Sequence, residues 1–140
     1  TSGLAGLRIG FAIGHADVIN RIRRVIGPYD INSFAVIAAF AALSDQEYVD
    51  NYVKEVLVAR EWVKERLTSQ NVRHQIEAGN YFLVWPNRNA IEVESSLKSE
   101  GVLVRNMQGK YLLEGSLRVS IGTTEQMEYF WKAYQKSDNA

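Results

Sequence analysis

"SLRVSIGTTEQ", residues 116–126, contains one predicted strand and the beginning of one predicted helix. Residues 116–122 form a short run rich in apolar residues that ends at a glycine, which is typical of a strand. Thr123 and Gln126 follow with the spacing of a capping box, in which two side chains satisfy the free N–H groups of a helix start. The helix after them carries an apolar stripe at helical spacing, formed by Met127, Phe130, Trp131 and Tyr134.

Two more strands are predicted upstream, at 80–86, where NYFLVWP ends on a proline, and at 102–105. Between them, Asn89 and Glu92 repeat the capping pattern before a helix that stops at Gly101. The order strand, helix, strand, strand, helix predicts an α+β fold. We expect a small mixed or antiparallel sheet with its helices on one face.

A long helix over residues 45–68 is predicted to precede this sheet. Ser44 and Glu47 form an S-x-x-E capping box at its start. At 1.5 Å per residue such a helix would be about 34 Å long, which is common in helices that link two domains. We therefore place a domain boundary at this point, with 1–44 in one domain and 45–140 in a C-terminal small domain. The apolar face of the helix comprises Val49, Tyr52, Val53, Val56, Ala59, Val63 and Leu67.

Residues 1–44 are predicted to form a strand followed by two helices. The apolar run over 7–14 is bounded by glycines and predicts a buried strand. Residues 16–27 have helical periodicity. Asn32 is a suitable N-cap for the apolar segment 33–43, which we expect to be a helix buried on most sides. This order suits a piece of a large α/β domain.

The composition disfavours several classes of function. Lys and Arg together number 16, as do Asp and Glu, and a zero net charge disfavours nucleic-acid binding. The absence of cysteine excludes disulfides and cysteine-bound zinc, and the two histidines lack the spacing of metal ligands. No apolar run reaches the roughly 20 residues of a membrane span, and no signal-peptide pattern is present. We therefore expect a cytoplasmic protein without metal, nucleic-acid or membrane binding.

The first ten residues, TSGLAGLRIG, combine three glycines with one arginine, Arg8. Glycines let backbone N–H groups approach an anion, and a guanidinium binds phosphate oxygens through two hydrogen bonds. Short glycine patterns are common, so spacing alone favours a structural turn with a surface arginine by about two to one.

Five blocks of the sequence carry a resemblance to a known family. In order they are SGLAGLRIGFAIG (2–14), DINSFAVIAAFAAL (30–43), GNYFLVWP (79–86), GVLVRNM (101–107) and SLRVSIGTTEQ (116–126). Together they resemble the C-terminal part of the pyridoxal-phosphate-dependent class I/II aminotransferases of fold type I, specifically those similar to histidinol-phosphate aminotransferase. The resemblance covers nearly the whole chain.

The resemblance implies that Arg8 binds the phosphate of pyridoxal 5'-phosphate. In the family this arginine follows, by eight residues, the lysine that holds the cofactor covalently, so the lysine would immediately precede Thr1. No catalytic residue is then expected within the chain. We expect the 140 residues alone to lack transaminase activity, and turnover by them would contradict this expectation.

Substrate-binding roles are also implied by the resemblance. Arg118 matches the arginine that binds the substrate α-carboxylate, and a planar guanidinium suits this task because it fixes a carboxylate at two points. Arg105 matches an arginine near the substrate's own phosphate, although a plain surface arginine is an equal alternative. Asn32 and Tyr29 lie in a segment that approaches the active site, often across a dimer interface, although helix capping explains Asn32 equally well.

The full-length protein is therefore expected to be a homodimeric aminotransferase that uses pyridoxal 5'-phosphate. Its small-molecule partners would be an amino acid or amino-alcohol phosphate, most simply histidinol phosphate, and a 2-oxo acid, 2-oxoglutarate. One alternative is a phosphothreonine decarboxylase of the same fold, which releases carbon dioxide. A second alternative, from another class, is a non-catalytic binding module that shares the small-domain fold.

Overall fold

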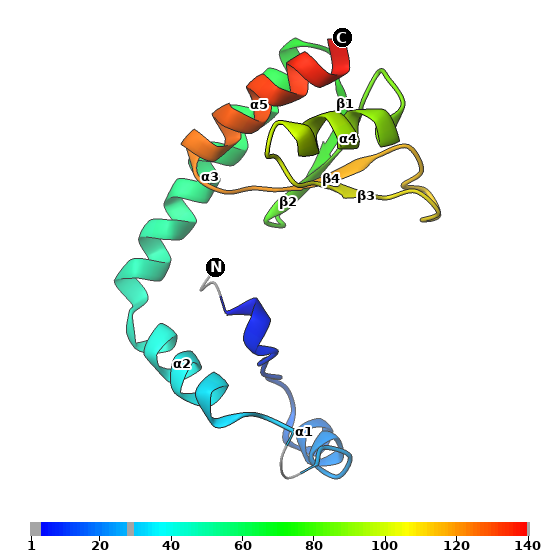
Figure 1. The fold of residues 1–140 in the computed structure, drawn as a ribbon. Coiled ribbons are helices and arrows are strands. Elements are labelled where there is room, and N and C mark those ends of the chain that lie inside the picture. The colour runs from blue at the N-terminus through cyan, green and yellow to red at the C-terminus, as the bar shows by residue number, and fades with distance from the viewer. Residues whose placement is uncertain (1–3, 28–29, 140) are drawn as a thin grey trace. The chain divides into compact units, whose positions relative to one another are not determined.

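The computed structural model describes residues 4–27 and 30–139. The chain divides into two compact units between Val53 and Lys54. The division falls inside the long helix α3, whereas the sequence placed a boundary at 44/45. In the first unit, the short 3-10 helix η1 precedes α1 and α2; in the second, a sheet is interleaved with α4 and α5 (Figure 1). The elements are η1 Ala5–Leu7, α1 Ala16–Arg23, α2 Ser33–Ser44, α3 Gln46–Ser69, β1 Arg73–Ile76, β2 Tyr81–Trp85, α4 Ala90–Ser99, β3 Arg105–Asn106, β4 Leu117–Ser120 and α5 Thr124–Asn139.

The second unit is built on a four-stranded antiparallel sheet in the order β1-β2-β4-β3. Phe82 and Val84 of β2 pair with Val119 and Leu117 of β4, and all four side chains are buried. This buried face meets α5, where the Phe82 and Phe130 rings lie 5.7 Å apart in an edge-to-face arrangement. The α+β prediction is therefore confirmed, with an antiparallel sheet.

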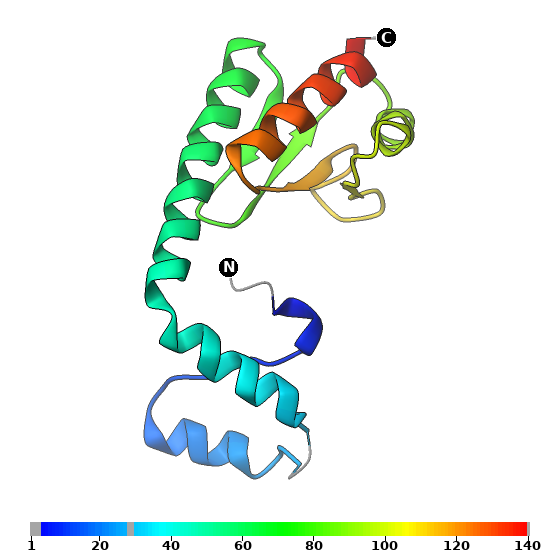
Figure 2. The ribbon, with the colours of Figure 1, turned by 60° about the vertical axis from the view of Figure 1, so that its left-hand side comes forward.

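Helix α5 is held at both ends by side-chain hydrogen bonds. At its start, the Thr123 N–H donates to Gln126 Oε1 over 3.0 Å and the Gln126 N–H donates to Thr123 Oγ1 over 3.2 Å, as the capping pattern predicted. Its apolar stripe is buried as expected. In Figures 1 and 2, α5 lies alongside the C-terminal half of α3.

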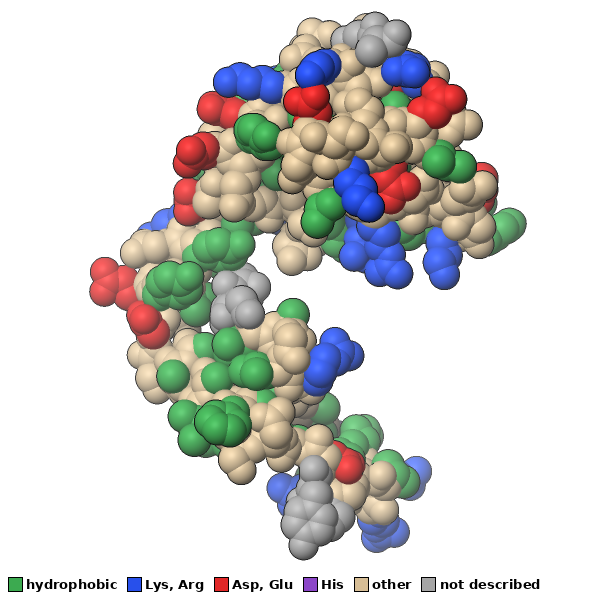
Figure 3. All heavy atoms as spheres, viewed as in Figure 1, with side chains coloured by type: hydrophobic (Ala, Val, Ile, Leu, Met, Phe, Trp, Pro, Cys, Tyr) green, Lys and Arg blue, Asp and Glu red, His purple; other side chains and the backbone are tan. Residues whose placement is uncertain are grey.

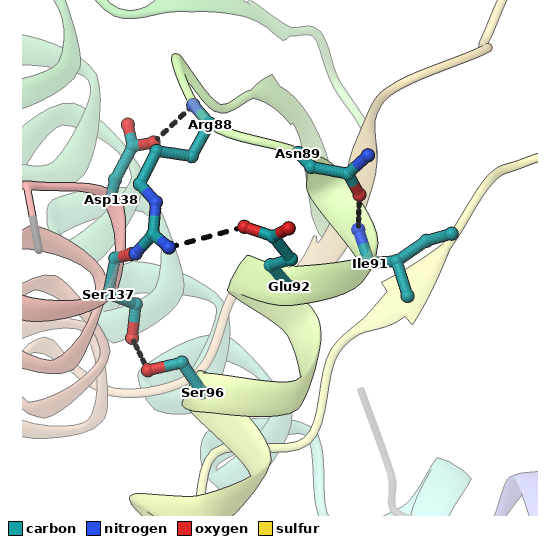
Figure 4. Close-up of polar contacts among 7 residues, drawn as sticks. All are labelled: Arg88, Asn89, Ile91, Glu92, Ser96, Ser137 and Asp138. Atoms are coloured by element: carbon teal, nitrogen blue, oxygen red, sulfur yellow. Dashed lines mark hydrogen bonds and ion pairs between the residues drawn. The ribbon is translucent and has the colours of Figure 1, made fainter.

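The C-terminal end of α5 is joined to the loop before α4 by a polar cluster (Figure 4). The buried Asp138 carboxylate accepts hydrogen bonds from the backbone N–H groups of Asn87, at 3.1 Å, and Arg88, at 2.9 Å. Arg88 Nη1 donates to the Ser137 carbonyl over 2.9 Å, and Ser137 Oγ donates to Ser96 Oγ over 2.9 Å. Buried polar groups satisfied in this way fix α5 against α4.

The predicted strands differ from the observed ones in extent. Residues 80–86 form β2 and 116–122 contain β4, whereas only Arg105 at the end of the predicted strand 102–105 pairs, in the two-residue β3. Strand β1 was not predicted from the sequence, because its residues RHQI carry a single strongly apolar side chain.

In the first unit, two predictions are wrong: the strand over residues 7–14 and the burial of the helix over 33–43. The buried strand over 7–14 is absent: η1 occupies Ala5–Leu7 and the residues up to His15 have no regular structure, with Phe11 80% and Ile13 91% exposed. A strand requires a neighbouring strand, and all strands of the described residues lie between Arg73 and Ser120. Helix α2 forms with Asn32 as its N-cap, but only Ala35 in it is buried, because the first unit offers too little surface to cover an all-apolar helix.

The capping box predicted from Ser44 and Glu47 is also wrong. Ser44 belongs to the end of α2, where its hydroxyl donates to the Phe40 carbonyl over 2.9 Å. The N-cap of α3 is Asp45, whose Oδ1 accepts from the Tyr48 N–H over 3.2 Å. The residues of its apolar face that are buried are Val56, Ala59, Val63 and Leu67.

Candidate functional site

The face of the sheet opposite the core carries two of the arginines singled out by sequence. Strand register aligns Gln75, Leu83, Arg118 and Arg105 in one row across all four strands. Paired residues of antiparallel strands point to the same side of a sheet, and successive residues alternate between sides. Because Phe82 points into the core, this row lies on the other face, which we call the open face.

Arg118 lies at the edge of a hollow on the open face, with a volume of about 330 Å³. Its side chain is half-buried, and its guanidinium carbon lies 5.3 Å from the centre of the Tyr81 ring. No carboxylate lies within 4.0 Å of this guanidinium among the residues described. The hollow is also lined by Gln75, Glu77, Gly79, Leu83, Met107 and Leu113.

Arg105 is exposed and lies directly opposite Arg118 in the pairing of β3 with β4. Like charges directly opposite one another destabilise a sheet. Within the described part of the chain, no acidic group makes an ion pair with either of these two residues. An anion bound between the two guanidinium groups would relieve their repulsion. Figure 3 shows Lys and Arg side chains gathered below the strands labelled β3 and β4 in Figure 1.

The other two predicted site residues come together in the first unit. Arg8 is exposed, ends η1 with a left-handed backbone at φ 54°, and its N–H donates to the Ala5 carbonyl over 3.3 Å. Asn32 Oδ1 accepts from the Ala35 N–H over 2.8 Å, while its Nδ2 donates to the Leu7 carbonyl over 3.5 Å. The Asn32 side chain thus connects the start of α2 to the residue before Arg8.

The Arg8 turn fits an oxyanion such as a phosphate. Its guanidinium makes no ion pair with an acidic side chain of the described residues, and α2 presents its N-terminus from Asn32 onwards. A Cβ atom added at Gly6 or Gly10 would meet no atom within 4 Å, so the space beside the turn is open. Tyr29, the fifth residue considered from the sequence, lies outside the described residues.

The two histidines have structural contacts. His15 is the N-cap of α1, where its Nδ1 accepts from the Asp17 N–H over 3.3 Å, and His74 Nδ1 lies 2.8 Å from the Val72 carbonyl oxygen. Over 4–27 and 30–139, no group of three or more His, Cys, Asp or Glu side chains is arranged to hold a metal ion. None of the helices described here combines the length and apolarity that crossing a membrane requires.

Tyr81, Gln75 and Glu77 line the hollow together with Arg118 and were not predicted from the sequence. Tyr81 belongs to a strand that was predicted, so alternation along NYFLVW places it on the face opposite Phe82. Gln75 and Glu77 had no comparable pattern, because β1 was not recognisable as a strand.

Comparison with known proteins places the chain in a family. The model of the family "Aminotransferase class I and II" matches residues 1–133. The chain belongs to the class I and II aminotransferases. This aminotransferase chain is 35% identical, over 127 residues, to histidinol-phosphate aminotransferase 1 of Pseudomonas fluorescens strain Pf-5. That match covers 88% of the chain but 36% of the relative, so the chain spans little more than a third of the length of the curated relatives it matches.

Solved structures share the fold of this aminotransferase chain. The crystal structure of the histidinol-phosphate aminotransferase from Clostridium acetobutylicum superposes with a TM-score of 0.84 at 22% identity, covering 98% of the chain and 42% of that structure. The L-threonine-O-3-phosphate decarboxylase from Porphyromonas gingivalis gives a TM-score of 0.71 at 20% identity, covering 96% and 42%. The resemblance found in the sequence is thus confirmed. The matched region contains all four predicted site residues, Arg8, Asn32, Arg105 and Arg118.

Proposed function

We propose that the protein containing this chain is a pyridoxal-phosphate-dependent aminotransferase that transfers an amino group between histidinol phosphate and 2-oxoglutarate. Family membership and the name of the Pseudomonas fluorescens relative support this proposal. The observation that carries it is the pair Arg105 and Arg118, two cationic side chains held opposite each other on the open face without an acidic partner among the described residues.

The two arginines would serve different anions. Arg118 is half-buried beside Tyr81, and its planar guanidinium suits the carboxylate of 2-oxoglutarate or of the glutamate formed from it. Histidinol phosphate has a phosphate group and no carboxylate, and the exposed Arg105 would bind that phosphate. Both arginine–anion contacts would orient the substrate rather than take part in bond cleavage.

Arg8, with Asn32 beside it, would hold the cofactor phosphate. When bound, pyridoxal phosphate acts as an electron sink that weakens the bonds at the substrate Cα. Asn32 would keep the turn in place through its hydrogen bond to the Leu7 carbonyl. A homodimeric state and a cytoplasmic location, both expected from the sequence and its family resemblance, belong to the same proposal.

The experiment is a pair of half-reactions with the full-length protein loaded with pyridoxal phosphate. We expect histidinol phosphate and 2-oxoglutarate to give glutamate. Arg118→Ala should weaken 2-oxoglutarate binding by about 2–5 kcal/mol, the range for removing one partner of a desolvated charge pair. Arg105→Ala should raise the KM for histidinol phosphate more than that for 2-oxoglutarate.

A matched control is Arg73→Ala. Arg73 lies on β1 with its guanidinium carbon 4.3 Å from the Trp85 ring centre and does not line the hollow. The Arg73→Ala substitution should leave the KM and kcat of both half-reactions unchanged. Unchanged 2-oxoglutarate binding in Arg118→Ala would refute the proposed role of that residue, and the absence of glutamate with both substrates would refute the activity.

A second candidate function is decarboxylation of phosphothreonine, which the likeness to the Porphyromonas gingivalis structure favours. The substrate of that reaction carries both a carboxylate and a phosphate, so Arg118 and Arg105 would be used together. Released carbon dioxide, with no glutamate formed, would select this function over amino transfer.

A further inference from the structure

We propose that Arg60 and Tyr81 are positioning residues that fix the guanidinium of Arg118 on the open face of the sheet. This inference rests on the proposed function, because it explains how the carboxylate-binding arginine acquires its orientation. It connects α3, on which Arg60 lies, to the hollow through the turn between β1 and β2.

Arg60 anchors that turn. Its Nη2 donates to the carbonyl oxygens of Ala78 and Gly79, each over 3.3 Å. The Nε–H of the same guanidinium is buried without a hydrogen-bond partner in the part of the chain that the structure describes. An unsatisfied buried donor lowers stability, so the Arg60 side chain carries an energetic cost at this position. Its two carbonyl contacts tie the turn to the helix.

The anchored turn sets the place of the Tyr81 ring. A Cβ atom added to Gly79 would lie 3.3 Å from Tyr81 Cε1 and 3.4 Å from Cδ1. The shorter of these distances is tighter than most real Cβ contacts, so the ring lies where a side chain at residue 79 would extend. A glycine at this position leaves the room that the ring occupies.

Tyr81 in turn bounds the position of Arg118. Tyr81 pairs with Ser120, two residues from Arg118 along β4, so the two side chains are diagonal neighbours on the open face. The guanidinium carbon lies 5.3 Å from the ring centre, within the range of a cation–π contact. No acidic side chain of the described residues pairs with Arg118, and in the proposal the Tyr81 ring restricts the plane of its guanidinium. A carboxylate bound at two points requires that plane to be fixed.

The first experiment tests Tyr81 in the full-length protein loaded with pyridoxal phosphate. Tyr81→Leu should raise the KM for 2-oxoglutarate about two- to fivefold with little change in kcat, as expected from losing one cation–π contact. Tyr81→Phe keeps the ring and should restore the wild-type value. Equal KM values for Tyr81→Leu and wild type, or failure of Tyr81→Phe to restore the wild-type KM, would overturn the link between the Tyr81 ring and 2-oxoglutarate binding.

The second experiment reads the orientation of Arg118 directly, without substrate or cofactor. The ring current of Tyr81 acts on protons that lie over its face, so the Nε–H resonance of Arg118 in the 140-residue chain reports their contact. Tyr81→Leu, Gly79→Ala and Arg60→Met should each move this resonance toward the position of a free arginine. If Arg60→Met and Gly79→Ala leave it unchanged, the proposed connection from α3 is wrong.

Arg66→Met is the matched control for Arg60→Met. Arg66 also lies on α3 and also donates to a backbone carbonyl, that of Trp62, over 3.1 Å, but it does not reach the turn. It should leave the Arg118 resonance in place. The two experiments also separate the hypotheses: a moved resonance with unchanged substrate binding would refute the carboxylate role of Arg118, whereas an unmoved resonance would refute the positioning.

Discussion

At the residue scale, the arginine pair Arg105 and Arg118 places two like charges on neighbouring strands, and under the proposed function the same pair binds substrate anions. Opposite positions on neighbouring antiparallel strands bring side chains into contact, and two positive charges there repel. Of the two, only Arg118 lines the hollow, and residues whose arrangement lowers stability are typical of functional sites.

The repulsion predicts that Arg105→Ala does not destabilise the 140-residue chain. We expect the free energy of unfolding to stay equal or to rise by about 0.2–1 kcal/mol, the range of a cross-strand pair. The gain should shrink in high salt, which screens charges that are exposed. Urea denaturation at low and high salt measures both effects, and a loss greater than 1 kcal/mol would show that Arg105 stabilises the sheet.

Tyr134 gives a prediction about pH. The Tyr134 hydroxyl is buried and donates a hydrogen bond to the Asp138 carboxylate over 2.9 Å. Burial, followed by the charge of Asp138 and this hydrogen bond, raises the pKa of the Tyr134 phenol above its ordinary value of about 10. The unfolded chain therefore ionises this tyrosine first, so its stabilising contribution is complete below about pH 10 and is lost as the pH rises further.

We expect the free energy of unfolding to fall more steeply above about pH 10 in the wild-type chain than in Tyr134→Phe. The extra slope is at most about 1.4 kcal/mol per pH unit, the value for one proton. Urea denaturation at a series of pH values measures it, and the difference between the two chains removes the contribution of other groups. Parallel curves would mean that Tyr134 ionises alike in both states.

At the element scale, adjacent residues that can both cap a helix compete for its start, and the hydrogen bonds that form decide between them. At the start of α5, Thr123 and Thr124 are adjacent candidates, and the two reciprocal hydrogen bonds between Thr123 and Gln126 make Thr123 the cap. At the start of α3, Ser44 and Asp45 are adjacent, and α2 extends through Ser44. That extension leaves Asp45 as the residue between the two helices.

The same competition predicts different effects of two neighbouring substitutions. Asp45→Ala should destabilise the first turn of α3 by about 0.5–2 kcal/mol, the cost of losing an N-cap. Ser44→Ala should have little effect on that turn, because its hydroxyl bonds the Phe40 carbonyl of α2. Hydrogen exchange of the Tyr48 amide, the donor to Asp45, measures both. Faster exchange in Ser44→Ala alone would restore Ser44 as the cap.

At the scale of the whole molecule, the two units differ in what holds them together. Of the described apolar residues that are buried, only Ala35 belongs to the first unit. The second unit contains the sheet and its contact with α5. Burial of apolar surface is the main favourable term in folding, so the second unit carries most of the stability. The first unit exposes large apolar side chains, among them Phe11, Phe34, Ile37, Phe40 and Leu43.

Residues 54–140 are therefore expected to unfold cooperatively when expressed alone, with a urea m-value of about 1 kcal/mol/M or more. Residues 1–53 alone should show no cooperative transition. Circular dichroism during urea denaturation of each segment measures this. A gradual, uncooperative loss of signal from 54–140 would mean that its core depends on the first unit.

What the sequence determined by itself is the set of features that depend on nearby residues. The α+β order, the strand at Tyr81–Trp85, the capping box at Thr123 and the family blocks around Arg8 and Arg118 all rest on contacts or patterns within a few positions. The predicted strand over 7–14 failed for the same reason, since a strand needs a partner that local sequence does not specify.

The tertiary structure alone decided which of these side chains lie next to one another. Register between β3 and β4 placed Arg105 opposite Arg118, although 12 residues lie between them, and the register of β2 placed Tyr81 beside Arg118. A shift of one residue would turn either side chain to the other face of the sheet. The pairing of β2 with β4 is set by burial of Phe82, Val84, Leu117 and Val119, with Phe82 packed against α5, which is a property of the assembled core.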